Sequence, residues 1–266
     1  MTSRTLAVII LFACLSPLPV DVTTPPTTPP TAPPTAPPTT PPTAAASKAA
    51  TIKPPALPDP LPPGAVVYGT LTGREAQVTS AAPLERIVGK SSAVVGFAIP
   101  GPADGPAKLV AASWVLPVKS LATGLPLRDE HMAGPAWLDA ARHPTLQFAL
   151  TRVGAIKQLK RGEGFTTWSV TLVGAMTIHG VTREIQVADA RLSFLDESEK
   201  TRSIAPGNLI FLKCDYSVTL SDYGIRHADV PIKVSDTVEL SQMLRMSDAT
   251  KVEGSREGGA GRGEPV

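Results

Sequence analysis

Apolar and polar side chains alternate with a period of two along much of the chain, and this pattern restricts its fold more than any other feature. In residues 168–178 large apolar side chains occupy one face, and serine or threonine occupies much of the other. Residues 210–220 repeat the pattern. Such alternation predicts half-buried β-strands, because successive side chains of a strand point to opposite faces. The two apolar faces comprise Trp168, Val170, Leu172, Gly174, Met176 and Ile178, and Ile210, Leu212, Cys214, Tyr216, Val218 and Leu220.

Shorter segments with similar patterning predict further strands, about eight or nine in all. We expect one helix, at residues 133–142, with Pro135 in its first turn and His143-Pro144 after its end. One helix is too few for parallel crossovers, so the strands should be antiparallel. Long antiparallel strands close into a barrel or pack as a sandwich, since open edges invite aggregation. The remaining candidate strands are residues 66–71, 76–80, 92–99, 109–118, 145–152, 183–194 and 232–240.

The segment before these strands has a different composition. Residues 16–64 hold most of the 29 prolines of the chain, largely in Pro-Pro-Thr repeats. Proline favours polyproline II and removes a backbone donor, so this segment predicts a disordered, semi-rigid stalk. A proline-rich ligand for a partner domain is the alternative. We expect a β-domain at residues 65–244 and a disordered polar tail at residues 245–266, where glycine and balanced charges predominate.

Residues 1–15 are typical of an export signal, with Arg4 before the apolar run of residues 6–13. That run is too short to span a bilayer as a helix. Leu11-Phe12-Ala13-Cys14 resembles a bacterial lipobox, in which the cysteine is acylated; an ordinary apolar cysteine of the signal is the alternative. The chain is therefore expected in the periplasm or cell envelope, as an outer-membrane lipoprotein if Cys14 is acylated. With Cys14 removed or acylated, Cys214 has no disulfide partner.

Charge and motifs argue against several classes of function. The formal net charge is +2, and Lys and Arg are spread without a basic block, so we expect no nucleic-acid partner. The histidines have no metal-binding spacing, and neither G-x-S-x-G nor H-E-x-x-H occurs. We therefore predict no metal site, no cofactor and no enzymatic activity. The four histidines are His131, His143, His179 and His227.

Five short motifs occur in order over about 105 residues of the predicted domain. They read SLATG at 120–124, RDEHM at 128–132, LDAARHPTLQF at 138–148, GAMTIHGVTRE at 174–184 and LSDYGI at 220–225. Together they resemble the YceI-like family. Its pattern has Phe, Tyr or His at the place of His143, and His, Arg or Lys at the place of His179. The resemblance implies an all-β, antiparallel, lipocalin-like barrel of about eight strands with one short helix, in exported bacterial proteins.

The same resemblance implies a long apolar amphiphile as ligand: a polyisoprenoid, a quinone precursor or a fatty-acid-like lipid. The chain would then be a carrier that holds this molecule inside the barrel and is attached to the membrane through its anchor. An envelope-tethered structural or protein-interaction domain without a ligand is the alternative. We expect the lining to include large or central residues of the apolar faces, although each would equally suit a solid core. These residues are Phe148, Trp168, Leu212, Tyr216 and Val238.

Two polar features have a structural and a functional interpretation. Arg128 and His131 either bind a ligand head group at the mouth of the barrel or belong to a lock that holds a helix over the barrel end. Asp236 interrupts an apolar strand face, where a carboxylate is costly unless paired. Arg128, Lys213 or Arg183 could pair with it, or a bulge could turn it outward. Gly174, Gly180 and Gly224 are interpreted as bends and turns.

Overall fold

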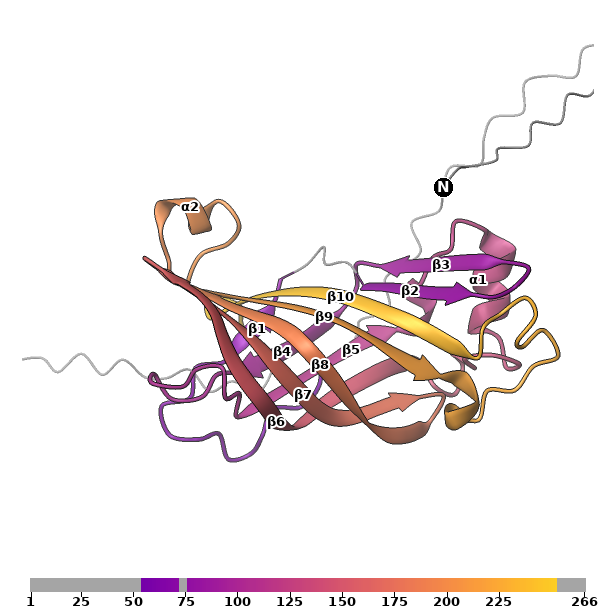
Figure 1. Ribbon diagram of the computed structural model, residues 1–266, viewed down its shortest axis with the longest axis horizontal. Helices are drawn as coiled ribbons and strands as arrows, with labels where there is room; N and C mark the ends of the chain where they lie inside the picture. The colour runs from indigo at the N-terminus through magenta and orange to yellow at the C-terminus, as the bar shows by residue number, and fades with distance from the viewer. Residues whose placement is uncertain (1–53, 72–75, 253–266) are drawn as a thin grey trace, which may run out of the picture. The chain divides into compact units, whose positions relative to one another are not determined.

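A computed structural model describes residues 54–71 and 76–252. The expected signal, Cys14, the stalk up to residue 53 and the end of the tail lie outside these residues. Eight antiparallel strands close into a barrel, because β1 pairs with both β4 and β10 (Figure 1). This confirms the predicted fold class. The ring consists of β1 (Tyr68–Thr70), β4 (Val95–Ile99), β5 (Ala111–Pro117), β6 (Thr145–Gly162), β7 (Phe165–Ile178), β8 (Val181–Leu195), β9 (Leu209–Thr219) and β10 (Thr237–Ser247).

Two further strands form a hairpin at one end of the barrel. β2 (Ala76–Ala81) pairs with the first half of β10, whereas β1 pairs with the last residues of β10. β3 (Arg86–Ser91) pairs with β2 and reaches the rest of the sheet through a single bridge from Lys90 to Ala122. The sequence pattern did not predict β3. Its RIVGKS segment is short and contains a glycine, and β2 is the one strand that it pairs with along its length.

The helix lies earlier than the sequence predicted. α1 spans Pro126–Ala133, with Pro126 in its first turn, and residues 134–142 form turns instead. The prediction of a helix at 133–142 was wrong because proline disfavours a helical residue before it, which ends the helix at Gly134-Pro135. Asp139 also has a left-handed φ of 44°, which no α-helix accommodates. The other helices are short: η1 (Val118–Ser120), α2 (Glu199–Arg202) and η2 (Leu220–Tyr223).

β6 and β7 form a long ribbon whose far end is solvent-exposed. β6 continues well beyond the predicted boundary at Arg152, through three shifts of register with β7. At these bulges the alternation of side chains is lost, so the sequence did not reveal the extension. A Cβ at Gly174 would overlap the Phe148 ring and the Ala149 carbonyl. Gly174 therefore permits the close approach that its place on an apolar face had indicated.

Turns and helix ends account for the other two glycines. His179 and Gly180 have φ values of 50° and 74° and join β7 to β8 as a two-residue hairpin turn. Gly224, at φ 76°, ends η2.

Asp236 contacts none of the cations proposed for it. Its carboxylate accepts from the backbone N–H and the hydroxyl of Ser221, at 2.9 and 2.7 Å, and so holds η2 to the residue just before β10.

The inward faces of the ring make one apolar core, in which Trp114 stacks on Phe148 at 4.4 Å between ring centroids. A second, smaller cluster joins Leu57 and Leu61 to Phe97 and Ile99. The last residues assigned to the stalk therefore pack on the β-domain. β10 likewise runs to Ser247, past the boundary expected at 244. None of the helices in the described part of the chain is long and apolar enough to cross a membrane.

Candidate ligand cavity

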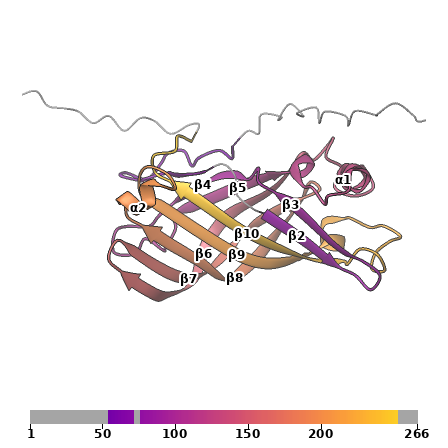
Figure 2. The same cartoon turned by 90° about the horizontal axis from the view of Figure 1, so that it is seen from above.

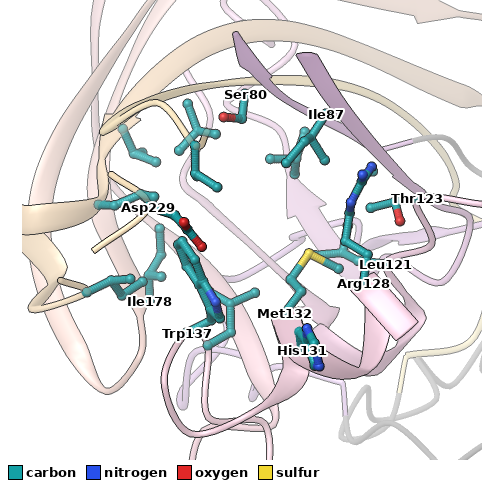
Figure 3. A pocket seen from close by; sticks show the side chains of 18 of the residues that line it. Ser80, Ile87, Leu121, Thr123, Arg128, His131, Met132, Trp137, Ile178 and Asp229 are labelled. Carbon is teal, nitrogen blue, oxygen red and sulfur yellow. The ribbon is translucent and has the colours of Figure 1, made fainter. Parts of the chain in front are cut away.

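A cavity of about 250 Å³ lies at the end of the barrel that carries α1 and the β2–β3 hairpin. α2 lies at the opposite end (Figure 2). The walls come from the hairpin, from α1 and the turns after it, from the ends of several ring strands and from the loop between η2 and β10. In Figure 3, Met132 and Trp137 lie on one side of the space, and Ser80 and Ile87 lie on the other.

Most of the cavity wall is aliphatic or aromatic. Strands of the ring contribute inward-facing residues, because period-two alternation turns every second side chain to the interior. The remaining large groups come from the β2–β3 hairpin, from α1 and the segments on either side of it, and from η2 and the loop after it. Such a surface binds apolar matter by releasing water from both partners. The apolar lining comprises Val78, Ile87, Gly89, Leu121, Met132, Trp137, Leu138, Leu146, Ile178, Val218, Leu220, Ile225, Val234, Val238 and Leu240.

Charged groups in the wall occur as pairs of opposite sign. The Arg128 guanidinium forms an ion pair with Glu85, which joins α1 to the β2–β3 turn. Lys233 Nζ lies 3.1 Å from Asp229. His131 is exposed at the same wall. Since each cation has a carboxylate beside it, these two pairs carry no net charge.

α1 is held in place by one more polar contact. The Asp129 carboxylate accepts from the backbone N–H of Thr123 at 2.8 Å and from its hydroxyl at 2.6 Å. This contact joins the two ends of the segment 123–129 to each other, and the Arg128–Glu85 pair holds the segment to the β2–β3 turn. The structural interpretation of the RDEH cluster, a lock over the barrel end, matches this arrangement.

The structure divides the residues proposed from the sequence into two groups. Arg128, His131 and Val238 line the cavity. The remaining four do not line it and belong to the core, because they lie deeper in the ring or toward its other end. Phe148 and Leu212 are fully buried, and Trp168 and Tyr216 are partly buried against the core. These four are Phe148, Trp168, Leu212 and Tyr216.

Several lining residues were not proposed for the site from the sequence. Trp137 and Leu138 were assigned to a helix, and Ile87 lies in the strand that was missed. Trp137 also stacks on His227, with ring centroids 4.4 Å apart. The hydrophobic character of these residues was visible, but which cavity they face depends on the turns after α1 and on the hairpin docking to β10.

The barrel interior contains polar atoms without a hydrogen-bond partner among the described residues. They include the hydroxyls of Tyr216 and Tyr223. Burial raises the pKa of Tyr216 well above its ordinary value, and the nearby Cys214 and Tyr223 raise it further. Burial also raises the pKa of the Cys214 thiol to about 12. These groups therefore stay neutral inside the barrel at physiological pH.

The histidines are closer in space than their spacing in the sequence suggested. Asp139, His143 and His179 offer ligand atoms that all lie within 4.8 Å of one another. The first two come from the turns between α1 and β6, and the third from the β7–β8 turn. Sequence spacing could not reveal this cluster, because the two segments meet only when the barrel closes.

The fold and the site define a closed antiparallel barrel with an apolar cavity at one end, which is a lipocalin-like architecture. The chain belongs to the YceI-like family, whose domain model matches residues 58–246. This confirms the resemblance seen in the five motifs. No curated protein matches the sequence.

Several solved structures are similar to the chain at low sequence identity. BcnA from Burkholderia cenocepacia is 14% identical with a TM-score of 0.49, over 65% of this chain and 95% of that one. A polyisoprenoid-binding domain from Saccharophagus degradans is 14% identical with a TM-score of 0.46, over 69% and 98%. A Campylobacter jejuni YceI protein is 16% identical with a TM-score of 0.42, over 59% and 82%.

Proposed function

We propose that the protein is an exported carrier that holds a long apolar amphiphile, such as a polyisoprenoid, a quinone precursor or a fatty-acid-like lipid. The apolar cavity at the α1 end of the barrel is the observation that carries this proposal. Membership of the YceI-like family supports it, because the family resemblance implies ligands of this class. The alternating strands also support the proposal, because they line the barrel interior with apolar side chains.

The size of the cavity indicates how much of such a ligand it encloses. At about 250 Å³ it is slightly smaller than the roughly 300 Å³ at which ordinary ligand pockets begin. It therefore suits one segment of an apolar chain. A longer molecule would leave its remainder outside or displace side chains of the core.

The charges in the wall indicate which head group suits the site. Arg128 is paired with Glu85, and Lys233 with Asp229. A carboxylate or phosphate head would meet as many negative as positive groups, so it gains little attraction there. An uncharged polar head, such as a hydroxyl or a quinone carbonyl, loses less water on entry. We therefore rank uncharged amphiphiles above acidic ones of the same chain length.

Native mass spectrometry of the full chain purified from bacterial membranes tests the proposal. We expect an added mass that is lost on extraction with chloroform and restored by adding a prenyl alcohol. Recovery of ligand-free protein alone, together with no rebinding of prenyl alcohols, quinones or fatty acids, would refute it. In that case a structural or protein-interaction domain becomes the better description.

The same preparation tests the membrane anchor, which is a separate part of the proposal. Acylation of Cys14 would add a covalent lipid mass that survives the extraction. The variant Cys14→Ser should lack this mass and leave the membrane fraction, while keeping the extractable ligand. An identical covalent mass in wild type and variant would exclude Cys14 as the anchor.

A further inference from the structure

We propose that Asp139, His143 and His179 form a binding site for a divalent transition-metal ion. One ligand atom of each side chain lies within 4.8 Å of the other two. Two imidazoles and one carboxylate are a donor set that Zn²⁺ and other first-row ions bind in proteins. The proposal does not depend on the lipid cavity or on its ligand.

The three residues come from two rigid parts of the fold. Asp139 and His143 lie in a tight turn, in which the Asp139 carbonyl accepts from the His143 N–H at 2.8 Å. His179 lies in the two-residue turn between β7 and β8. Gly180, beside it, has no side chain, and the His143 ring occupies the place that a Cβ there would need. The missing side chain thus lets the two segments approach.

The backbone of two of these residues is unusual. Asp139 and His179 have φ values of 44° and 50°, in a region that residues other than glycine rarely adopt. Asp189 is the one other non-glycine residue with positive φ in residues 54–71 and 76–252. At His179 the positive φ belongs to the two-residue turn that it forms with Gly180, and this turn lies where the His179 side chain reaches Asp139 and His143.

Hydrogen bonding and charge also suit a cation. The His179 Nδ1 lies 3.4 Å from the Tyr223 carbonyl oxygen, which can only accept, and the tautomer that donates to it leaves the lone pair of Nε2 available to a metal ion. Histidines that bind metals are oriented in this way by backbone carbonyls. The Asp139 side chain is only 8% exposed, and its partner Arg142, at 3.7 Å, is 80% exposed. A buried carboxylate with so weak a partner gains from a cation beside it.

The geometry requires only a small adjustment. In a tetrahedral zinc site with bonds of about 2.0–2.1 Å, neighbouring ligand atoms are about 3.4 Å apart. The ligand atoms, now within 4.8 Å of one another, would have to move closer by side-chain rotation to bind one ion. Both histidines are half-buried, so an ion can enter from solvent. Three protein ligands leave at least one position for water.

A bound ion would lie directly behind the wall of the apolar cavity. Leu138 and Ile178 line that cavity and immediately precede Asp139 and His179. The ion would therefore tie the turns after α1 to the β7–β8 hairpin. It should raise thermal stability, because it binds only the folded arrangement.

Zinc titration of the full chain, purified without a histidine tag and stripped with a chelator, tests this site. We expect one Zn²⁺ per chain, a melting temperature higher by several degrees, and visible Co²⁺ bands of a four- or five-coordinate site. His143→Phe should lose zinc affinity by more than about tenfold while the protein stays folded, since Phe is a residue that the family pattern accepts at that place.

Two further variants make the result specific. Asp139→Asn removes the carboxylate charge and should also lose at least about tenfold in affinity, without the Co²⁺ spectrum of wild type. His131→Gln removes a histidine from the cavity wall and should bind zinc as wild type does. Unchanged affinity in both His143→Phe and Asp139→Asn, or less than a fifth of an equivalent of zinc bound by wild type, would overturn the proposal.

Discussion

At the scale of single residues, Val238 in β10 belongs both to the apolar core and to the wall of the cavity. Val238 lies opposite Val218 on β9 and Ser80 on β2, and it is 6% exposed. All three residues line the cavity. Its inward direction follows from the alternation along β10. That it faces a cavity and not a filled core follows from the neighbours brought by β2 and α1.

Val238→Phe tests the cavity at this scale. The added ring should occupy the space of a ligand chain, so the dissociation constant for a prenyl alcohol should rise at least about tenfold, or about 1.4 kcal/mol. Because the ring enters a hollow and not a packed core, the overpacking cost should stay at or below about 1 kcal/mol. Fluorescence titration and thermal melts measure the two effects.

Ile232→Phe is the matched control for that substitution, since Ile232 is 53% exposed and does not line the cavity. It should bind the prenyl alcohol as wild type does. Equal affinity in wild type and Val238→Phe would place the ligand somewhere other than this cavity.

At the scale of elements, α1 and the β2–β3 hairpin are joined across the cavity wall by the Arg128–Glu85 pair. Both side chains are about one-third exposed, so water and salt weaken the pair. Its contribution to the stability of the whole domain should be small. The pair matters more for the charge of the cavity wall, because the Glu85 carboxylate neutralises the Arg128 guanidinium there.

Glu85→Gln tests this element contact. Stability should fall by less than about 1 kcal/mol. Arg128 would then lack its counter-charge, so a fatty acid should gain affinity by several-fold relative to an uncharged alcohol of the same chain length. Paired titrations of the two ligands measure the ratio. The gain should shrink as salt is added, because salt screens charge.

The control for this change is Glu163→Gln, which alters the same charge in the exposed β6–β7 turn. It should leave the ratio of the two affinities at the wild-type value. If Glu85→Gln does so as well, the charges in the cavity wall do not select the head group.

At the scale of the whole molecule, burial of the barrel interior makes stability depend on pH in the alkaline range. Burial raises the pKa of Cys214 from 9.0 to about 12 and that of Tyr68 from 10.0 to about 12. Between these values the unfolded chain loses protons that the folded chain keeps. The unfolded state is therefore favoured as pH rises.

We expect the free energy of unfolding to be insensitive to these groups below about pH 9 and to fall as pH rises toward 12. A group that is ionised in the unfolded chain and protonated in the folded chain lowers the free energy of unfolding by up to about 1.4 kcal/mol per pH unit. Urea unfolding at several pH values measures the slope. Cys214→Ala should lower stability at all pH values through the lost packing, but it should also make the alkaline slope shallower. A flat profile between pH 9 and 11 would contradict this account.

The sequence determined the parts of this protein that depend on local pattern. Period-two alternation predicted most of the ring strands, Gly180 predicted a hairpin turn, and five ordered motifs predicted the family. These signals are local, because a strand that is buried on one face must alternate whatever its partners are. Val238 could be proposed for the site on the same basis, whereas Arg128 and His131 were proposed from the dense polar cluster at residues 128–131.

Only the tertiary structure decided what depends on contact between distant segments. β3 exists because β2 pairs with it, and β6 extends because β7 supplies hydrogen bonds past the point where alternation ends. Asp236 accepts hydrogen bonds from Ser221 in η2 instead of pairing with a cation. The cavity forms where α1 and the hairpin meet the strand ends, and Asp139 approaches His179 only once the barrel has closed. The alternating strands therefore predicted the barrel, whereas its closure created the sites within it.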